Sequence, residues 1–289
     1  MSPISVEELY IFHRIDREVF FRLVIRLARN PAQSLLVMAF WLWIESIKYP
    51  KFITKLVGLS DPLINTFANE AVTGLRCLEM EYDDTPESGG GLPLTTILMQ
   101  EEISLQFFRQ KRFTIIVGIR CVLNKICARI FTDILQYLLG SANTSTSISY
   151  PSHYRPLVVP GFPHPLFGTF TIPPINFEEL DLFDPRIWIT MHGYDDGATD
   201  DDKTMFLTFS RGFPVTKEEV WHLFTRIYGD CIKFLNMGNG NINDQVLFAT
   251  MVLNNVEIVD RILNGMHVAK FRLNGKHIWA RKYERRDYI

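Results

Sequence analysis

Aromatic and basic residues that together could bind a nucleic acid are concentrated in the C-terminal part of this chain. Aromatic rings can stack on the bases of a single strand, at roughly 1 to 3 kcal/mol per base, and cationic groups can neutralise phosphates. The basic residues there are Lys270, Arg272, Lys276, Arg281, Lys282, Arg285 and Arg286, with Glu284 as the only acid between positions 270 and 286. The formal net charge of −2 excludes a basic field over the whole chain, so any affinity for nucleic acid must come from such a local cluster.

The elements that must position these residues are predicted as strand, helix, strand, strand, helix, strand. Apolar runs bounded by turn residues predict the strands, and Thr216 with Glu219 forms a capping-box pattern at the start of the first helix. The strands are predicted at 205–210, 231–237, 245–253 and 275–283, and the helices at 216–229 and 256–265. This order predicts the split β-α-β arrangement of ferredoxin-like folds.

Strand alternation predicts which side chains share a face of this sheet, because successive residues point to opposite sides. The residues expected to pack on the two helices are Met205, Leu207, Leu247, Ala249, Met251, Ile278 and Ala280. The residues then expected on the open face are Phe206, Thr208, Phe248, Thr250, Trp279 and Arg281. A slip of one residue in the last strand would turn Trp279 inward.

Two strand motifs carry a resemblance to a known family. Residues 205–207 run aliphatic, aromatic, aliphatic. Residues 246–253 meet an aromatic and a small position at Phe248 and Ala249, but they lack an opening basic-Gly pair and have Thr250 in place of a second aromatic. With these motifs, residues 204–286 resemble the RNA recognition motif family.

Two further segments extend the resemblance, because 263–265 and 274–283 are similar to the family's second helix end and fourth strand. The resemblance implies binding of single-stranded RNA on the open sheet face. The residues it implies for that site are Phe206, Thr208, Phe248, Thr250, Trp279, Arg281, Lys282, Arg285 and Arg286. The whole sequence also looks similar to a group of plant proteins that end in such a domain.

An alternative interpretation makes the protein an adaptor. The open face would then be covered by other parts of the chain or would dock a protein, and the basic residues would form an ordinary solvated edge. In that case the N-terminal half of the chain, which is predicted to be helical, would bind a protein partner or associate with itself. This half contains large apolar residues such as Phe40, Trp41 and Trp43.

The rest of the chain is predicted to be a helical domain at 1–140 and a Pro-rich, acidic linker at 141–202, followed by the RNA-recognition-like domain at 203–286. In the helical part, Ser5 with Glu8 and Asn30 with Pro31 give helix-start patterns, and Gly140 is expected to close the last helix. The linker has too many large apolar residues to be fully solvated, so part of it is expected to lie against a domain. Those residues are Phe162, Leu166, Phe167, Phe170, Phe177, Leu182, Phe183 and Trp188.

Catalytic and metal-binding patterns find little support in the sequence. The seven histidines and four cysteines form no pair or set with metal-ligand spacing, and no nucleophile-elbow motif is present. The sequence therefore predicts no enzyme activity, no metal and no cofactor. The apolar run at 35–44 is shorter than the roughly 20 residues of a membrane-spanning helix, and residues 1–20 lack a signal-peptide pattern, so the expected location is the nucleus or the cytoplasm.

Overall fold

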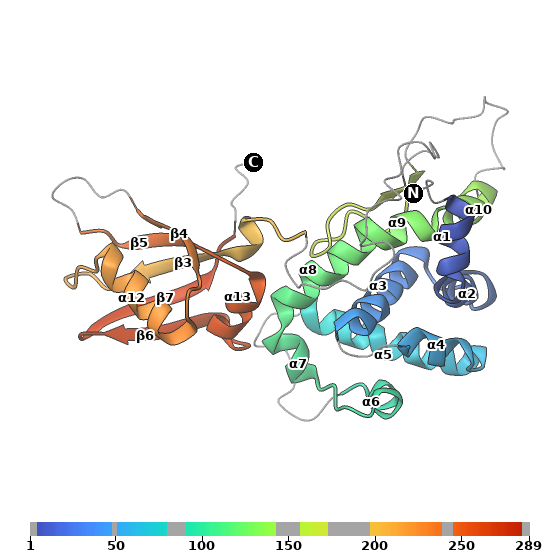
Figure 1. The fold of residues 1–289 in the computed structure, drawn as a ribbon, viewed down its shortest axis with the longest axis horizontal. Helices are drawn as coiled ribbons and strands as arrows, with labels where there is room; N and C mark the ends of the chain where they lie inside the picture. Colours follow the sequence, from blue (N-terminus) through green and yellow to red (C-terminus); the bar gives the residue numbers. More distant parts are fainter. Residues whose placement is uncertain are drawn as a thin grey trace. The chain divides into compact units, whose positions relative to one another are not determined.

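The computed structural model describes residues 5–47, 51–79, 91–142, 157–172, 197–238 and 245–284. It has a mixed α+β architecture, with most helices in the N-terminal half and an antiparallel five-stranded sheet in the C-terminal part (Figure 1). The chain divides into two compact units. The helical unit is formed by Met1–Glu79, Gly89–Ser104 and Gly118–Gly193, and the sheet unit by Met80–Ser88, Leu105–Val117 and Tyr194–Ile289.

The helical unit is built mainly from short helices. A π-helical turn follows α2 at Arg22–Arg26, and a second such turn lies at Leu123–Cys127. The helices are α1 (Val6–Phe12), α2 (Arg14–Phe21), α3 (Pro31–Ile47), α4 (Phe52–Val57), α5 (Asp61–Glu79), α6 (Pro93–Met99), α8 (Arg112–Val122), α9 (Ala128–Ile130) and α10 (Thr132–Ala142). Of these, α8 contributes its residues up to Val117 to the sheet unit.

The predicted helix starts are confirmed, while one predicted end is wrong. Glu8 N–H donates to Ser5 Oγ at 3.2 Å, and Ser5 N–H donates to Glu8 Oε2 at 2.8 Å. Asn30 Oδ1 accepts from Gln33 N–H at 3.0 Å at the start of α3. The helix α10 continues through Gly140 to Ala142, because a glycine inside a helix lowers its stability without ending it.

Helix α3 forms the centre of the helical core. Its residues from Leu35 to Ile44 are all buried, so the apolar run at 35–44 lies inside the helical unit. A Cβ atom on Gly118 would lie 2.0 Å from Trp43 Nε1, so this close approach requires glycine. Within the described residues, none of the helices combines the length and the hydropathy that crossing a membrane needs.

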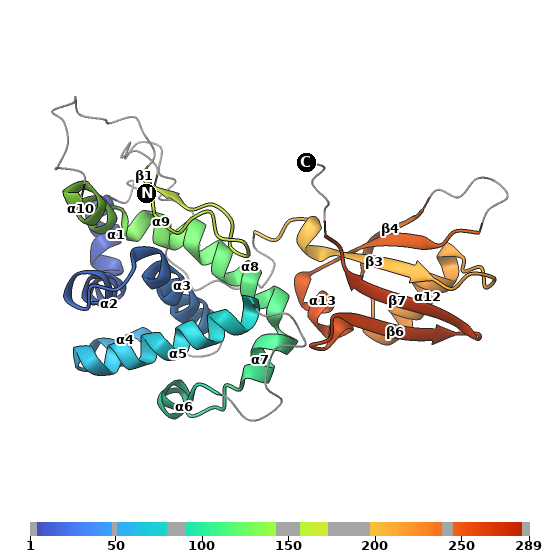
Figure 2. The ribbon, with the colours of Figure 1, turned by 180° about the vertical axis from the view of Figure 1, so that it is seen from behind.

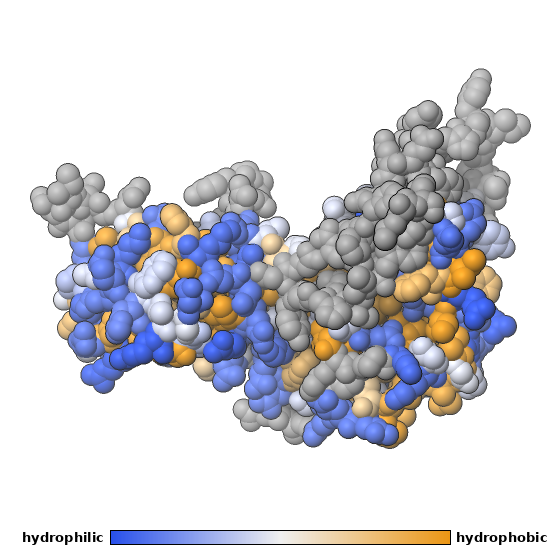
Figure 3. All heavy atoms as spheres, in the orientation of Figure 1, coloured by the Kyte–Doolittle hydropathy of each residue, from blue (hydrophilic) through white to orange (hydrophobic). Residues whose placement is uncertain are grey.

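The predicted linker contains a described segment that is folded. Strands β1 (Leu157–Val158) and β2 (Thr171–Ile172) pair antiparallel, and Phe162, Phe167 and Phe170 are buried, which confirms that part of this region packs on a domain. The apolar residues Phe177, Leu182, Phe183 and Trp188 lie outside the described residues. On the face drawn in Figure 3, hydrophilic and apolar side chains are mixed over the surfaces of both units.

The sheet unit contains five strands and the two helices predicted between them. The elements are β3 (Thr204–Phe209), α12 (Lys217–Tyr228), β4 (Ile232–Met237), β5 (Phe248–Leu253), α13 (Val256–Leu263), β6 (Val268–Leu273) and β7 (Lys276–Lys282). The strand order is β4-β5-β3-β7-β6, and α12 and α13 share one buried apolar cluster with the strands. The capping box of α12 is confirmed, since Glu219 N–H donates to Thr216 Oγ1 at 3.2 Å and Thr216 N–H donates to Glu219 Oε2 at 3.0 Å.

Strand β6 is absent from the sequence-based prediction. It pairs with β7 from Val268 to Leu273, through a turn in which Asn274 and Gly275 have φ values of +49° and +78°. Two consecutive residues with positive φ are typical of a two-residue hairpin, for which Asn-Gly is the strongest sequence signal. The sequence therefore predicts four of the five strands of this sheet and misses the edge strand β6.

The segment Leu105–Val117 also differs from expectation, because the sequence predicts it in the helical domain and it belongs to the sheet unit. It contains α7 (Leu105–Gln110) and the start of α8. Lys111 forms an ion pair of 2.8 Å with Glu257 of α13, and Phe113 packs against the apolar cluster of the sheet. Side-chain contacts between positions far apart in sequence therefore bring this segment to the sheet.

Candidate functional site

The open face of the sheet carries the six residues that strand alternation predicts there. Phe206 of β3 lies opposite Thr250 of β5 and Arg281 of β7. Thr208, two residues further along β3, lies opposite Phe248 of β5 and Trp279 of β7. Directly opposite residues in an antiparallel sheet project to the same side, so these six side chains share one face (Figure 2, where the strands lie in front of α12).

Burial separates the two faces of the sheet. Six of the seven residues predicted to pack on the helices, namely Met205, Leu207, Ala249, Met251, Ile278 and Ala280, have no exposed surface. Leu247 precedes β5 and is half-buried. On the open face, Phe248 keeps 42% of its surface exposed, while Phe206 and Trp279 are half-buried. Because Ile278 and Ala280 are buried, Trp279 faces outward and the register slip does not occur.

Two phenylalanines and an arginine form the centre of this face. The rings of Phe206 and Phe248 are stacked, with centroids 5.6 Å apart and planes inclined by 22°. The guanidinium carbon of Arg281 lies 4.8 Å from the Phe206 ring centroid, within the range of a cation–π contact. Neighbouring strands thus present two aromatic surfaces and one cation side by side.

Gly238 supports the Phe248 ring and is not recognisable as a site residue from sequence. Its N–H donates to the Phe248 carbonyl at 2.9 Å, and a Cβ atom there would lie 2.6 Å from Cε2 and Cζ of the Phe248 ring. Glycine therefore lets the backbone approach the ring closely. Only the pairing of β4 with β5 reveals this contact, since the segment reads in sequence as an ordinary turn.

Trp279 extends the aromatic surface away from this centre. The ring of His277 lies 5.9 Å from that of Trp279, centroid to centroid. On the other side of β7, strand β6 places Lys270 opposite Trp279 and Arg272 opposite His277. The sequence identifies both cations, but without β6 it cannot place them on the open face.

The remaining predicted cations have other positions. Lys282 lies opposite the buried Met205 and so on the helix side of the sheet; its Nζ donates to the carbonyls of Asp201 and Thr204 and lies 5.9 Å from the Phe113 ring centroid. Strand alternation separates it from Arg281, its neighbour in sequence. Arg285 and Arg286 lie outside the described residues.

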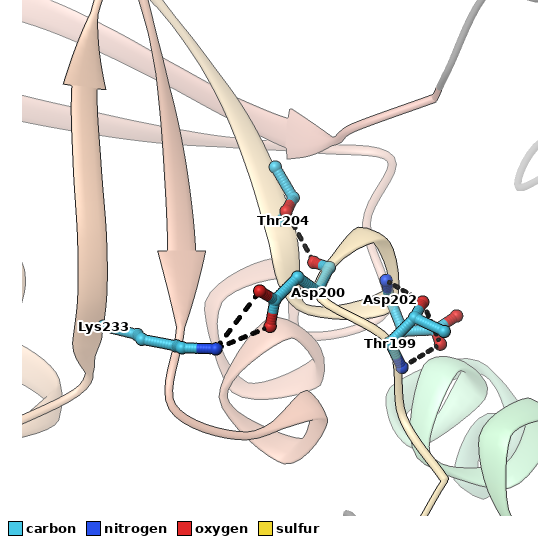
Figure 4. A network of polar contacts seen from close by, with 5 residues as sticks. All are labelled: Thr199, Asp200, Asp202, Thr204 and Lys233. Carbon is cyan, nitrogen blue, oxygen red and sulfur yellow. Dashed lines mark hydrogen bonds and ion pairs between the residues drawn. The ribbon is translucent and has the colours of Figure 1, made fainter.

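A polar network fixes the chain where it enters β3. The Thr204 hydroxyl donates to the Asp200 carbonyl at 2.6 Å, and Lys233 Nζ donates to both Asp200 carboxylate oxygens at 2.8 and 3.1 Å (Figure 4). The hydrogen bond from Lys233 lowers the pKa of the Asp200 carboxyl. Asp202 accepts from the N–H and the hydroxyl of Thr199, both at 2.8 Å. The carboxylates of Asp200 and Asp202 thus hold the segment that leads into β3.

The helical unit has a separate open hollow of about 500 Å³. Its lining residues are Arg14, Arg17, Glu18, Phe21, Asp133, Ile134 and Tyr137. Arg17 makes two hydrogen bonds to the Asp133 carboxylate, at 2.8 and 2.6 Å, and its guanidinium lies 3.7 Å from the Tyr10 ring centroid. Although burial acts to raise the pKa of the Asp133 carboxyl, the bonds from Arg17 outweigh it and hold that pKa below its ordinary value. The side chain of Arg17 is therefore already engaged within the protein.

Comparisons of the chain with protein-family models, with curated proteins and with solved structures found no match. Within the described part of the chain, no group of three or more His, Cys, Asp or Glu residues is arranged to hold a metal ion. The open sheet face is thus characterised by its own geometry alone.

Proposed function

We propose that the open face of the sheet binds single-stranded RNA, and that the sheet unit contains the ferredoxin-like arrangement of an RNA recognition motif. The elements β3, α12, β4, β5, α13 and β7 follow the required order along the chain. The strand order puts β3 and β5 side by side in the sheet, so the two proposed base platforms are neighbours. In this arrangement β6 is an addition at the edge.

The observation that carries the proposal is the stacked pair of Phe206 and Phe248 beside Arg281. Bases stack on such rings whatever their identity, at roughly 1 to 3 kcal/mol each. Arg281 can keep its contact with an aromatic plane and also donate hydrogen bonds to a phosphate, because its guanidinium is planar and has five donors. Thr208 and Thr250 add hydroxyl groups that can bond to bases or sugars.

The charge of the open face also supports binding to a polyanion. The strand residues opposite one another on this face include Arg281, Lys270 and Arg272, and none of the paired residues on it is acidic. An incoming phosphate backbone therefore meets no carboxylate among the described strand positions of the face. We expect an affinity that falls steeply as salt concentration rises.

The experiment that tests the proposal is a fluorescence anisotropy titration of the full chain with labelled single-stranded RNA of mixed sequence. Replacing Phe206 and Phe248 together by Ala should weaken binding by about 2 to 6 kcal/mol, the value of two stacked bases if they act additively. Trp221→Ala is the matched control, because this exposed aromatic lies on α12 and outside the apolar cluster. Equal affinity of the wild type and the double variant would refute the proposed site.

A protein adaptor is the second candidate function. It is favoured by the exposed apolar side chains Ile11, Phe12 and Tyr137 of the helical unit, each more than half exposed, since binding a partner protein would remove this apolar surface from water. The adaptor alternative gains if the full chain shows no affinity for RNA at low salt. Replacing Phe12 and Tyr137 by Ser should then abolish binding to a protein partner and leave the fold unchanged.

A further inference from the structure

Strand β6 enlarges the open face and gives it a basic edge. The residues of β6 that share this face are Val268, Lys270 and Arg272, which lie opposite Arg281, Trp279 and His277 of β7. Opposite residues have Cβ atoms about 5 Å apart. Three cations, Lys270, Arg272 and Arg281, thus gather on two adjacent strands, while the stacked rings of Phe206 and Phe248 lie on the next two.

The two cations of β6 differ from their basic neighbours in what they contact. Both are exposed, and neither forms an ion pair with another residue of the described part of the chain. Lys276, in contrast, lies 2.7 Å from both carboxylate oxygens of Glu219, and Lys282 bonds to backbone carbonyls on the helix side. The charges of Lys270 and Arg272 are therefore free for an anion that lies on the open face.

We propose that Lys270 and Arg272 of β6, together with Arg281 of β7, hold the phosphodiester backbone of the single-stranded RNA whose bases stack on Phe206 and Phe248. This assignment rests on the proposed function and specifies which edge of the sheet carries the backbone. Neighbouring strands lie about 4.8 Å apart, so β6 is about 10 Å from β3. Trp279 lies between Lys270 of β6 and Thr208 of β3 and provides a third surface for a base.

The cations of β6 should add affinity without adding sequence specificity. Contacts to phosphates position a strand without reading its sequence. Removal of the β6 cations should therefore weaken binding to RNAs of different sequence by similar factors. Because each neutralised phosphate contributes a slope of about −0.7 to log K against log salt on single strands, two lost contacts should make this slope shallower by about 1.4.

The test uses the full chain and a labelled single-stranded RNA of about 12 nucleotides, within the site sizes known for single-strand-binding sheets. The variant carries Lys270→Gln and Arg272→Gln. Its matched control carries Lys217→Gln and Arg226→Gln, which remove the same charge from exposed positions of α12. Affinities are measured at several concentrations between about 50 and 200 mM salt, and thermal unfolding verifies that both variants keep the fold.

We expect the β6 variant to lose roughly tenfold to a hundredfold in affinity at about 50 mM salt and to show the shallower slope, while the control keeps the wild-type slope. Arg272→Lys on its own should keep that slope, since the charge is retained. The β6 assignment is overturned if the β6 variant keeps the wild-type salt slope, or if the control loses as much affinity for RNA as the β6 variant does. Either result counts against this assignment even when the double variant of Phe206 and Phe248 has lost RNA binding. A wild type that binds no RNA overturns both this assignment and the proposed function.

Discussion

Asp260 and Thr114 lie 146 positions apart in the chain and are joined by two hydrogen bonds. Asp260 Oδ2 accepts from the Thr114 N–H at 2.8 Å and from its hydroxyl at 2.6 Å, and Asp260 Oδ1 accepts from the Phe113 N–H at 3.0 Å. The first N–H groups of a helix have no partner within that helix, and its N-terminus favours a negative charge. A carboxyl group of α13 thus caps the first turn of α8 and makes Leu105–Val117 part of the sheet unit.

Replacing Asp260 by Ala should destabilise the sheet unit. The substitution leaves the N–H groups of Phe113 and Thr114 without acceptors, and a lost cap or an unsatisfied buried donor costs about 1 to 3 kcal/mol. Urea unfolding followed by circular dichroism measures this loss. Asp230→Ala is the control, because Asp230 is exposed and its change should stay within about 0.5 kcal/mol. An unaltered free energy of unfolding in the Asp260 variant would show that the cap contributes nothing.

The contribution of Asp260 should also depend on pH. Burial raises its pKa from 3.8 to about 6, against the opposing effect of the hydrogen bonds from Thr114 and Phe113. A raised pKa in the folded state means that the folded protein binds the proton more tightly than the unfolded chain. The resulting stability is fully present below pH 3.8 and is lost as pH rises through about 6.

The measurement is the difference in free energy of unfolding between the wild type and Asp260→Ala at several pH values. This difference should grow by up to about 3 kcal/mol as pH falls from about 7 toward 4, because a pKa that is higher by one in the folded state than in the unfolded state corresponds to about 1.36 kcal/mol. Taking the difference cancels the other titrating groups. If this difference in free energy of unfolding instead shrinks as the pH falls, the hydrogen bonds outweigh burial and the pKa of Asp260 is lowered.

Gly238→Ala should weaken RNA binding through Phe248. The added Cβ atom would lie 2.6 Å from the ring, so the ring must leave its stacked position beside Phe206. We expect a loss of at most one stacked base, about 1 to 3 kcal/mol. Gly140→Ala is the control, because a Cβ atom there has no neighbour within 4 Å. Binding by the Gly238 variant that matches the wild type would mean that the position of the Phe248 ring is unimportant.

Local patterns are sufficient to predict much of the sheet unit. The capping box at Thr216 and the alternation along β3, β5 and β7 depend on residues that are close in sequence. They predict Phe206, Phe248 and Trp279 on one face, and the structure has them there. The strand β6 also has a local signal, the Asn-Gly turn at 274–275, but this signal is equally compatible with a turn that only begins the last strand.

Other features could not be predicted because they depend on contacts between distant parts of the chain. The cap from Asp260 to Thr114 requires knowledge of which helix ends meet. The support of Phe248 by Gly238 depends on the pairing of β4 with β5. The hydrogen bonds from Lys282 Nζ to the carbonyls of Asp201 and Thr204 likewise join residues 81 and 78 positions apart in the sequence.

The central claim is that single-stranded RNA lies on the open face of the sheet, and photo-crosslinking tests it most directly. The full chain is irradiated with a single-stranded RNA that contains 4-thiouridine, and the crosslinked peptides are identified by mass spectrometry. We predict crosslinks in the peptides that contain Phe206, Phe248 or Trp279, and their loss when Phe206 and Phe248 are replaced by Ala. Crosslinks confined to the helical unit or to α12, or the same crosslinks in the double variant, would contradict the claim.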